Sequence, residues 1–329
     1  MTSLVQVAIH RSQGPEQVRR DLLESLRTRR VNHKFLYDGV KQTQRWLAVH
    51  RSFAPSRIDL DCAATYDRAF AAVATGLGLG QVHLIGLGCG GGQKDTRLLT
   101  LLQESGRAVS YTPADVSTAM VLTARETALT VISAERCFPL VCDFAAAEDL
   151  PAVVESCSTQ GAARLFTFFG MIPNFEPGVI LPRLASVVRP KDCLLFSANL
   201  APGPDYAAGV QKILPLYDNP PTREWLMTFL LDLGVEKGDG TLDFTIEDDP
   251  VGSGLKRVVA RFGFCRACEV MVDEEQISFT GGEQIRLFFS YRHTLELVKS
   301  LLAAHGLKVL DQWITRSEEE GVFLVAKAG

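Results

Sequence analysis

An apolar run that breaks into glycines and then restarts as a helix constrains this chain more than any other feature. Residues 82–87 form a mostly apolar, strand-like run. Glycines lie at its end and directly after it, at Gly86, Gly88 and Gly90, and a polar helical segment begins near residue 93. Glycines let the backbone turn sharply and lie close against a flat ligand, while the N–H groups of the following helix point toward it. The pattern predicts a nucleotide-like cofactor, and leaves NAD, FAD, S-adenosylmethionine and a purely structural turn open.

Two further strand-like segments end in carboxylates. Residues 109–115 end at Asp115, and an acid at the tip of the second strand accepts hydrogen bonds from both ribose hydroxyls of an adenosine. Residues 138–144 end with Asp143 beside Phe144, which suits an adenine amino group and a ring face. Asp115 is the best candidate cofactor residue, whereas the second pair also fits a surface acid next to a core phenylalanine.

The order of the elements predicts the fold class. Strand-like runs alternate with helical segments that start near Asp95, Ser117 and Glu176, which predicts an α/β fold with a doubly wound parallel sheet. These runs are residues 82–87, 109–114, 138–142, 164–170 and 193–200. The chain then ends with a helix over 294–305 and two strands, 307–315 and 322–327, whose connecting turn requires antiparallel pairing. A terminal antiparallel hairpin is typical of Rossmann-like class I methyltransferases and favours S-adenosylmethionine over a dinucleotide.

The composition predicts two lobes. A chain of 329 residues with 47% hydrophobic residues can bury a large core. We expect residues 60–200 and 290–329 to form the S-adenosylmethionine-binding Rossmann-like domain. Residues 1–59 and 201–289 would form a substrate-binding lobe.

Charge and hydropathy point to a small-molecule partner. The net charge is −4 and no basic run or stripe is visible, which argues against nucleic acid. No segment has the length of a membrane span, and residues 1–16 lack the pattern of a secretory signal, so we expect a cytoplasmic protein without a membrane partner. Cys265 and Cys268 lack a second pair, and His33, His50 and His293 lack ligand spacing, so no metal site is predicted.

Several ordered motifs resemble the histidine-specific S-adenosylmethionine-dependent methyltransferases of ergothioneine biosynthesis. They cover most of the chain: 34–38 (KFLYD), the glycine loop with 93–99 (QKDTRLL), 113–117 (PADVS), 142–144 (CDF), 169–175 (FGMIPNF), 216–218 (LYD) and 290–292 (SYR).

The resemblance implies a role for individual residues. The residues that it assigns to S-adenosylmethionine are Tyr37, Gly88, Lys94, Asp115, Asp143 and Phe144, and we add Gly86 from the glycine turn. Lys94 at a helix start is suited to the methionine carboxylate. Asn174 and Tyr217 would hold the amino and carboxylate groups of an acceptor amino acid, and we place Ser290 beside them as the third acceptor residue. Relatives also imply a monomer.

Two departures from the family concern the acceptor. Where the family has a glutamate that reads imidazole, this chain has Phe288, and Phe53 stands in place of an acceptor-side tyrosine. Without these partners the ring nitrogens of histidine would be buried unsatisfied, at about 1–3 kcal/mol each. We therefore expect an acceptor other than histidine. Phe53, Phe169 and Phe288 would line its pocket and stabilise cationic groups, although Phe169 also fits an ordinary core position.

Three functions remain open from the sequence. The first is N-methylation of a small amino acid or amine with an apolar or aromatic side chain. The second is cyclisation of S-adenosylmethionine to azetidine-2-carboxylate and methylthioadenosine, with Asn174, Tyr217 and Ser290 holding its own amino acid part. The third is a non-catalytic protein that binds S-adenosylmethionine without consuming it.

Overall fold

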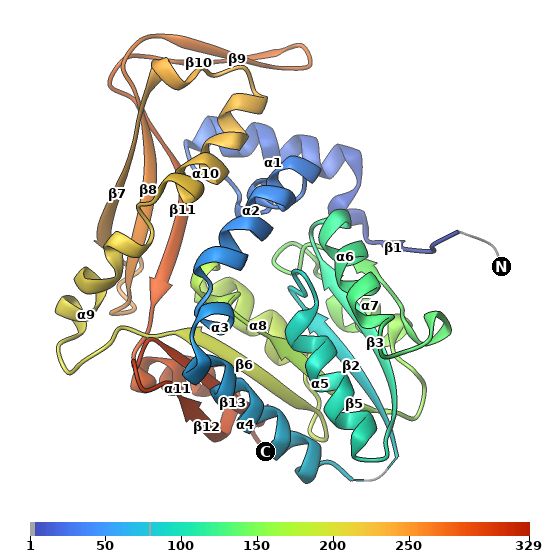
Figure 1. Ribbon diagram of the computed structural model, residues 1–329. Coiled ribbons are helices and arrows are strands. Elements are labelled where there is room, and N and C mark those ends of the chain that lie inside the picture. The colour runs from blue at the N-terminus through green and yellow to red at the C-terminus, as the bar shows by residue number, and fades with distance from the viewer. Residues whose placement is uncertain (1–3, 79) are drawn as a thin grey trace.

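A sheet of eight strands forms the centre of the computed structural model, which describes residues 4–78 and 80–329 (Figure 1). The strand order is β1-β4-β3-β2-β5-β6-β13-β12. The first six of these strands are parallel, and β13 and β12 run antiparallel at one edge. Their bounds are β1 Ala8–Ile9, β2 Gln81–Leu87, β3 Ala108–Asp115, β4 Leu140–Val141, β5 Ala163–Phe168, β6 Cys193–Asn199, β12 Leu307–Ile314 and β13 Glu320–Lys327.

Helices cover both faces of this sheet, which explains why β2, β3 and β5 are buried along almost their whole length. One face packs against α4 (Leu60–Gly76), α5 (Gln93–Glu104) and α6 (Thr118–Ala128). The other packs against α7 (Leu150–Cys157), α8 (Pro177–Val187) and α11 (Leu295–Ala304). The predicted α/β fold is confirmed.

The predicted terminal hairpin is also confirmed. β12 and β13 pair antiparallel, and β13 pairs antiparallel with β6. In this register Glu320 lies opposite Asn199. The hairpin therefore brings a carboxylate to the carboxyl end of the parallel sheet.

Two predicted strands are shorter in the structure. The run 138–142 forms a ladder only at β4, because Pro139 has no N–H to donate and Phe138 is turned toward solvent. The run 164–170 ends at Phe168, and Gly170 turns the chain with a φ of 68°. Phe169 and Gly170 are thereby placed in the turn above the sheet.

A second group of elements lies above the carboxyl ends of the central strands (Figure 1). Its sheet has the antiparallel order β11-β8-β7, with strands β7 (Gly240–Asp248), β8 (Lys256–Phe264) and β11 (Gln284–Arg292). A separate hairpin consists of β9 (Cys268–Val272) and β10 (Glu275–Phe279). Its helices are α1 (Pro15–Thr28), α2 (Val40–Phe53), α3 (Pro55–Ile58), α9 (Tyr206–Ile213) and α10 (Pro220–Asp232), and the short 3-10 helices η2 (His33–Leu36) and η5 (Leu214–Leu216) complete it.

This second group has its own hydrophobic core, which joins α1, η2 and α10 to the antiparallel sheet. The indole N–H of Trp225 on α10 donates to the carbonyl of Leu36 at 2.8 Å, so the two segments are fixed to each other. The small strand β1 instead pairs with β4 at the edge of the central sheet. The division at residues 59/60, 200/201 and 289/290 stays a prediction, and its residues 1–3 lie outside the described part of the chain.

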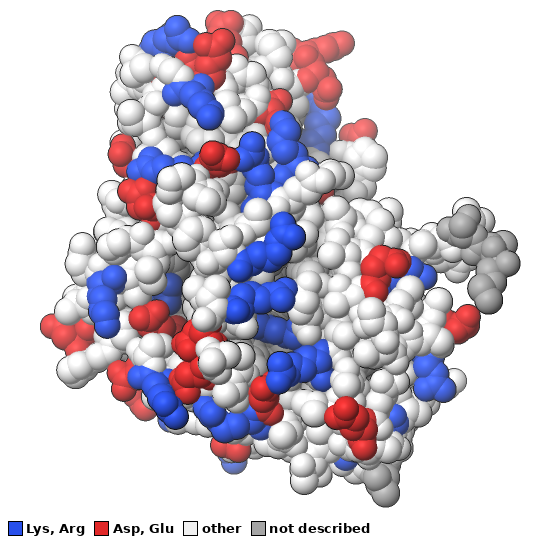
Figure 2. All heavy atoms as spheres, in the orientation of Figure 1, with Lys and Arg blue, Asp and Glu red and all other residues white. Residues whose placement is uncertain are grey.

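Lysine and arginine side chains form a column down the middle of the face shown in Figure 2, over α2, α3 and the start of α5. The sequence shows no such stripe, because the cations come from separate helices. Cations on α2 and α5 have acidic partners, in the pairs Lys41–Asp232, Arg45–Glu224 and Arg97–Asp67. Among the described helices, none is long and apolar enough to cross a membrane.

Candidate active site

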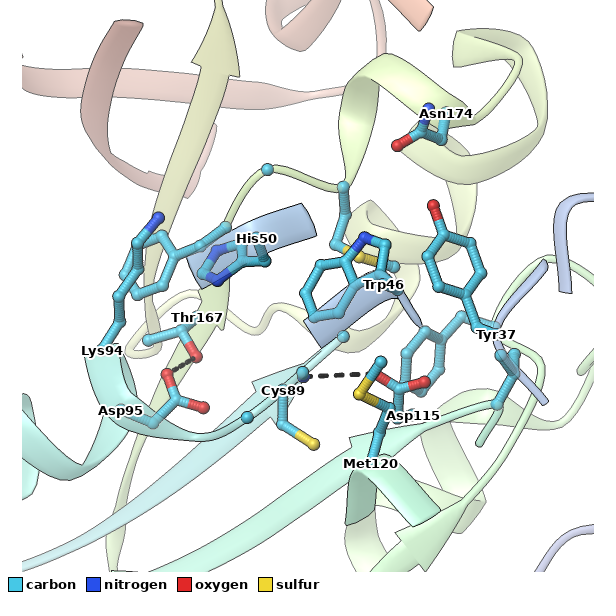
Figure 3. A pocket seen from close by; sticks show the side chains of 18 of the residues that line it. Tyr37, Trp46, His50, Cys89, Lys94, Asp95, Asp115, Met120, Thr167 and Asn174 are labelled. Carbon is cyan, nitrogen blue, oxygen red and sulfur yellow. Dashed lines mark hydrogen bonds between the residues drawn. The ribbon is translucent and has the colours of Figure 1, made fainter. Parts of the chain in front are cut away.

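A cavity of about 170 Å³ lies at the carboxyl ends of β2, β3 and β5 (Figure 3). The chain reverses the direction of strand addition between β2 and β5, and ligands of open α/β sheets bind at such switch points. A second hollow of about 260 Å³ adjoins it under α2 and β11. We call these the inner cavity and the outer hollow. The residues that line both are Tyr37, Trp46, His50, Lys94, Gly170 and Asn174.

The glycine loop forms one wall of the inner cavity. Gly88 has a φ of 76°, and its N–H donates to the carbonyl of Ala114 on β3 at 2.8 Å. Gly92 precedes α5 with a φ of 76°, and a Cβ there would lie 2.7 Å from the Cα of Ala124. Both positions therefore need glycine, one for the turn beneath the cavity and the other for close packing of α5 on α6.

Asp115 ends β3 and faces the inner cavity, as predicted from its place in the sequence. Its carboxylate accepts hydrogen bonds from the N–H groups of Gly90 at 3.3 Å and Ser117 at 3.1 Å. The residue is 8% exposed. Burial raises the pKa of Asp115 to about 6, although these backbone hydrogen bonds lower it. The carboxylate keeps lone pairs for further donors.

The acid and the aromatic residue at the end of the segment 138–144 lie in different places. Phe144 lines the inner cavity, but Asp143 is not on its wall. The carboxylate of Asp143 accepts from the N–H groups of Ala145 and Ala146 and lies 3.8 Å from the ammonium of the buried Lys34. In this structure Asp143 therefore supports a local turn, and its predicted contact with the cofactor stays a prediction.

Gly86 is likewise away from the cavity wall. It lies buried within β2, and a Cβ added there would collide with the carboxylate of Asp95 and approach the hydroxyl oxygen of Tyr111 to 3.1 Å. The glycine leaves room for Asp95, which does line the cavity. A direct contact of Gly86 with the cofactor stays a prediction.

Lys94 stands where the two hollows meet. Its ammonium lies 3.9 Å from the centre of the Tyr66 ring and 3.9 Å from a carboxylate oxygen of Glu320. Burial lowers the pKa of Lys94, and the negative charge of Glu320 opposes this shift. The predicted partner of a methionine carboxylate thus already has an acidic neighbour from the terminal hairpin.

Polar groups of the outer hollow come from η4 (Ile172–Asn174), the end of η5 and β11. The side-chain amide of Asn174 donates to the carbonyl of Phe289 at 2.8 Å, and Figure 3 shows its oxygen directed toward the cavity. The hydroxyls of Tyr217 and Ser290 are 2.8 Å apart, and Arg292 donates to the Tyr217 oxygen at 2.9 Å. The structure thus brings the three predicted acceptor residues to the rim of one hollow.

Arg292 is a cation without an acidic partner in the described chain. It is 7% exposed, its Nη1 donates to the carbonyl of Leu200 at 3.3 Å, and its Nε has no hydrogen-bond acceptor. A buried cation that is not paired costs stability unless a ligand supplies the anion. The outer hollow therefore favours a ligand with a negatively charged group.

The three predicted pocket phenylalanines lie in different parts of the site. Phe53 lines the outer hollow and is 43% exposed. Phe288 lines it from β11 and packs edge-on against Trp225, with ring centres 5.8 Å apart. Phe169 lines the inner cavity and packs edge-on against Tyr66 at 5.3 Å.

The sequence analysis predicted Phe53 of α2 as a site residue but missed two other residues of the same helix. Trp46 and His50 line both hollows, and their rings stack with centres 4.8 Å apart (Figure 3). Burial and the nearby Lys94 lower the pKa of His50 to about 3, so its imidazole is neutral. Trp46, His50 and Phe53 are spaced by four and three residues, and this spacing predicts one shared helix face.

Other missed residues come from β5 and the loop after it, from β11, from the terminal hairpin and from the start of α5. They are Thr167, Met171, Arg292, Glu320 and, beside the predicted Lys94, Asp95. His33, which the sequence analysis considered only as a metal ligand, also lines the inner cavity.

A parallel sheet with a terminal antiparallel hairpin and an acid at the tip of β3 beside the glycine turn places the protein among the S-adenosylmethionine-dependent methyltransferases. The model of the family described as histidine-specific, S-adenosylmethionine-dependent methyltransferases matches residues 18–327, so the chain belongs to that family. The predicted family and cofactor are thereby confirmed. No curated protein matches the sequence.

Solved structures with a related arrangement are distant. The magnesium protoporphyrin IX methyltransferase of Synechocystis PCC 6803 has a TM-score of 0.47 and 13% identity, covering 89% of this chain and 97% of that one. The 1,6-didemethyltoxoflavin N1-methyltransferase of Burkholderia thailandensis has a TM-score of 0.41 and 14% identity, covering 87% and 91%. Neither likeness carries information about the acceptor of this protein.

Proposed function

We propose that the protein transfers the methyl group of S-adenosylmethionine to the amine of a small amino acid other than histidine, with an apolar or aromatic side chain. One observation carries this proposal: Asn174, Tyr217, Ser290 and the unpaired Arg292 surround a hollow that adjoins the inner cavity. The coarser activity, S-adenosylmethionine-dependent methyl transfer, follows from the family.

The inner cavity has the chemistry to hold the cofactor. The partly satisfied carboxylate of Asp115 suits a ribose diol, Phe144 suits an adenine face, and the turn at Gly88 admits close backbone approach. Tyr37 lies over the same cavity, where burial and the charge of Asp115 raise the pKa of its phenol, so it acts as a neutral group. We assign Tyr37, Gly88, Lys94, Asp115 and Phe144 to the cofactor on these grounds.

The acceptor amine needs orientation more than activation. S-adenosylmethionine supplies an electrophilic methyl carbon, and the protein gains rate chiefly by holding a nucleophile in line with it. The inward oxygen of Asn174 can accept a hydrogen bond from the amine, because its nitrogen is already bonded to Phe289. Neutral His50, with its pKa near 3, is too weak a base to deprotonate an ammonium. His50 is therefore not the base, and the amine must be neutral when it attacks the methyl carbon.

The carboxylate end of the acceptor would meet Arg292, Tyr217 and Ser290. Hydrogen bonds between charged groups are stronger than neutral ones, and the buried guanidinium has no acidic partner in the described residues. This supports an α-amino acid over a simple amine.

The side chain of the acceptor would lie among aromatic rings. Phe53, Trp225 and Phe288 line the outer hollow. None of these side chains has a nitrogen or oxygen atom that could accept a hydrogen bond from an imidazole N–H. The ring nitrogens of a histidine placed among these three rings would lack partners on them, at about 1–3 kcal/mol each. An apolar or aromatic side chain has no such cost.

Cyclisation of S-adenosylmethionine to azetidine-2-carboxylate is the second candidate. In that reaction its amine would attack its own γ-carbon while the C–S bond breaks and methylthioadenosine leaves. Cyclisation would be favoured if aromatic rings filled the acceptor pocket and left no room for a second substrate. The outer hollow of about 260 Å³ leaves such room and therefore supports an external acceptor. A non-catalytic binding protein is the third candidate, and the polar acceptor residues around the hollow argue against it.

The test compares matched acceptors. Release of S-adenosylhomocysteine is measured with phenylalanine, tryptophan and histidine, and with phenethylamine and tryptamine, which lack the carboxylate. The proposal expects turnover with an aromatic amino acid, a much lower kcat/KM for its decarboxylated partner, and none above background for histidine. Equal rates for amino acid and amine would contradict the role of Arg292, and a preference for histidine would contradict the proposal itself.

A further inference from the structure

The carboxylate of Asp95 occupies the space that a side chain at Gly86 would fill. Asp95 lies in the first turn of α5, and its side chain turns back over the end of β2. Tyr111 donates to one carboxylate oxygen at 2.6 Å, and Thr167 donates to the other at 2.8 Å, as Figure 3 shows for the latter. Residues of β3 and β5 thus fix a carboxylate that comes from the helix between β2 and β3.

This carboxylate has no cationic partner within ion-pair distance among the described residues. It is 3% exposed, and its two donors are neutral hydroxyls. Burial raises the pKa of Asp95 to about 6, because the charged form is poorly solvated. A buried, unpaired carboxylate destabilises a protein, so its presence on a cavity wall points to a ligand that carries a positive charge.

The position of Asp95 relative to the glycine loop indicates which part of the cofactor it meets. Asp115 lies at the end of the loop that suits the ribose, whereas Asp95 lies at the other end, next to Lys94. The amino acid half of S-adenosylmethionine carries one α-carboxylate and one α-ammonium. Lys94 and Asp95 both line the inner cavity, and their opposite charges complement this pair of groups.

We propose that Asp95 binds the α-ammonium group of the methionine half of S-adenosylmethionine, while the neighbouring Lys94 binds its α-carboxylate. Glu320 is the other acid near Lys94, but it lines only the outer hollow, whereas Asp95 lines the inner cavity. Gly86 takes part by leaving the space in which the Asp95 carboxylate sits. The inference depends on the cofactor of the family and not on the identity of the acceptor.

Calorimetric binding of three ligands tests the proposal. S-adenosylhomocysteine carries both charged groups, 5′-deoxy-5′-(3-carboxypropylthio)adenosine lacks only the α-amine, and 5′-methylthioadenosine lacks the amino acid half. In the native protein, loss of the α-amine should weaken binding by about 10- to 100-fold, the effect of losing a hydrogen bond to a charged group. This comparison needs no variant that could fail to fold.

The variant Asp95→Asn completes the cycle. It should bind S-adenosylhomocysteine about 10- to 100-fold more weakly than the native protein, and the two ligands without an α-amine within about twofold. Glu104→Gln, at the exposed end of the same helix, is the matched control and should change none of the three. Equal weakening of all three ligands by Asp95→Asn would show that Asp95 only supports the glycine loop. Unchanged binding of S-adenosylhomocysteine would also overturn the proposal.

Discussion

The hydroxyl oxygen of Tyr217 lies 2.8 Å from the hydroxyl oxygen of Ser290, although 73 residues separate them in the chain. Tyr217 follows η5, and Ser290 lies on β11. Alternate residues of a strand share one face, so Arg292 projects to the same side as Ser290 and donates to Tyr217 at 2.9 Å. Two distant segments therefore present one polar surface to the acceptor.

Replacing Arg292 should affect the acceptor and not the cofactor. Arg292→Gln removes the buried cation, and we expect the KM of the acceptor to rise by about 10- to 100-fold. Arg292→Lys should recover part of this loss, since it keeps the charge but not the forked geometry. The measurement is steady-state kinetics together with calorimetric binding of S-adenosylhomocysteine. Arg266→Gln, an exposed arginine paired with Asp239, is the control. An equal loss of S-adenosylhomocysteine binding in Arg292→Gln would contradict the assignment.

Asn174→Ala should separate cofactor binding from turnover. The variant loses the oxygen that faces the amine but leaves Asp115, Phe144 and the glycine loop intact. We expect kcat/KM for the acceptor to fall by about 100-fold, while S-adenosylhomocysteine binds as in the native protein. Turnover at the native rate would show that Asn174 does not orient the acceptor.

Asp115→Asn should stabilise the protein when no ligand is bound. The pKa of Asp115 is raised from 3.8 to about 6 in the folded state, so its ionised form opposes folding above pH 6. The destabilisation is absent below the unfolded pKa and grows as the pH rises from 3.8 to about 6. At pH 7 we expect the variant to gain about 1–3 kcal/mol in free energy of unfolding. Thermal unfolding at pH 4 and pH 7 measures this, and an equal gain at both values would contradict it.

The same residue predicts how nucleoside binding depends on pH. Ribose hydroxyls donate to the ionised carboxylate of Asp115, so the affinity for 5′-methylthioadenosine should fall as the pH drops below about 6. This ligand lacks the amino acid half and therefore does not report on Asp95. Asp115→Ala should abolish the binding. A native affinity that stays constant from pH 5 to pH 7 would argue against this role of Asp115.

Two substitutions should move the acceptor preference toward histidine. The double variant Phe53→Tyr, Phe288→Glu adds a phenol and a carboxylate to the outer hollow, where both phenylalanines lie. We expect it to lose at least about 10-fold in kcat/KM for an aromatic amino acid, because a charge now faces an apolar ring. We also expect measurable methylation of histidine, followed by mass spectrometry. The prediction would be wrong if the native protein methylated histidine faster than the double variant does.

Much of the central sheet could be predicted because its strands are buried on both faces and therefore read as continuous apolar runs. The hairpin β12–β13 was predictable for a second reason, since a short turn forces antiparallel pairing. The sequence failed to predict strands correctly where the apolar pattern is short or interrupted. The strand β1 has two residues, and β4 is shortened by Pro139.

Some residues of the candidate site could also be predicted from the sequence, whereas others could not. Asp115 and Phe144 were predictable because a strand end leads directly into the cavity. The positions of Asp95 and Asp143 depend on tertiary partners, namely Tyr111 and Thr167 for the first and Lys34 for the second. Arg292 was hidden for another reason, because an unpaired cation is recognisable only when all its neighbours are known.

Mass spectrometry of the products tests the central claim most directly. The purified protein is incubated with S-adenosylmethionine alone and then with pooled amino acids and small amines. The proposed function predicts S-adenosylhomocysteine only when an acceptor is present, together with an amino acid that has gained the mass of one or more methyl groups. Methylthioadenosine above the rate without enzyme, formed in the absence of any acceptor, would instead identify a cyclising enzyme and contradict methyl transfer.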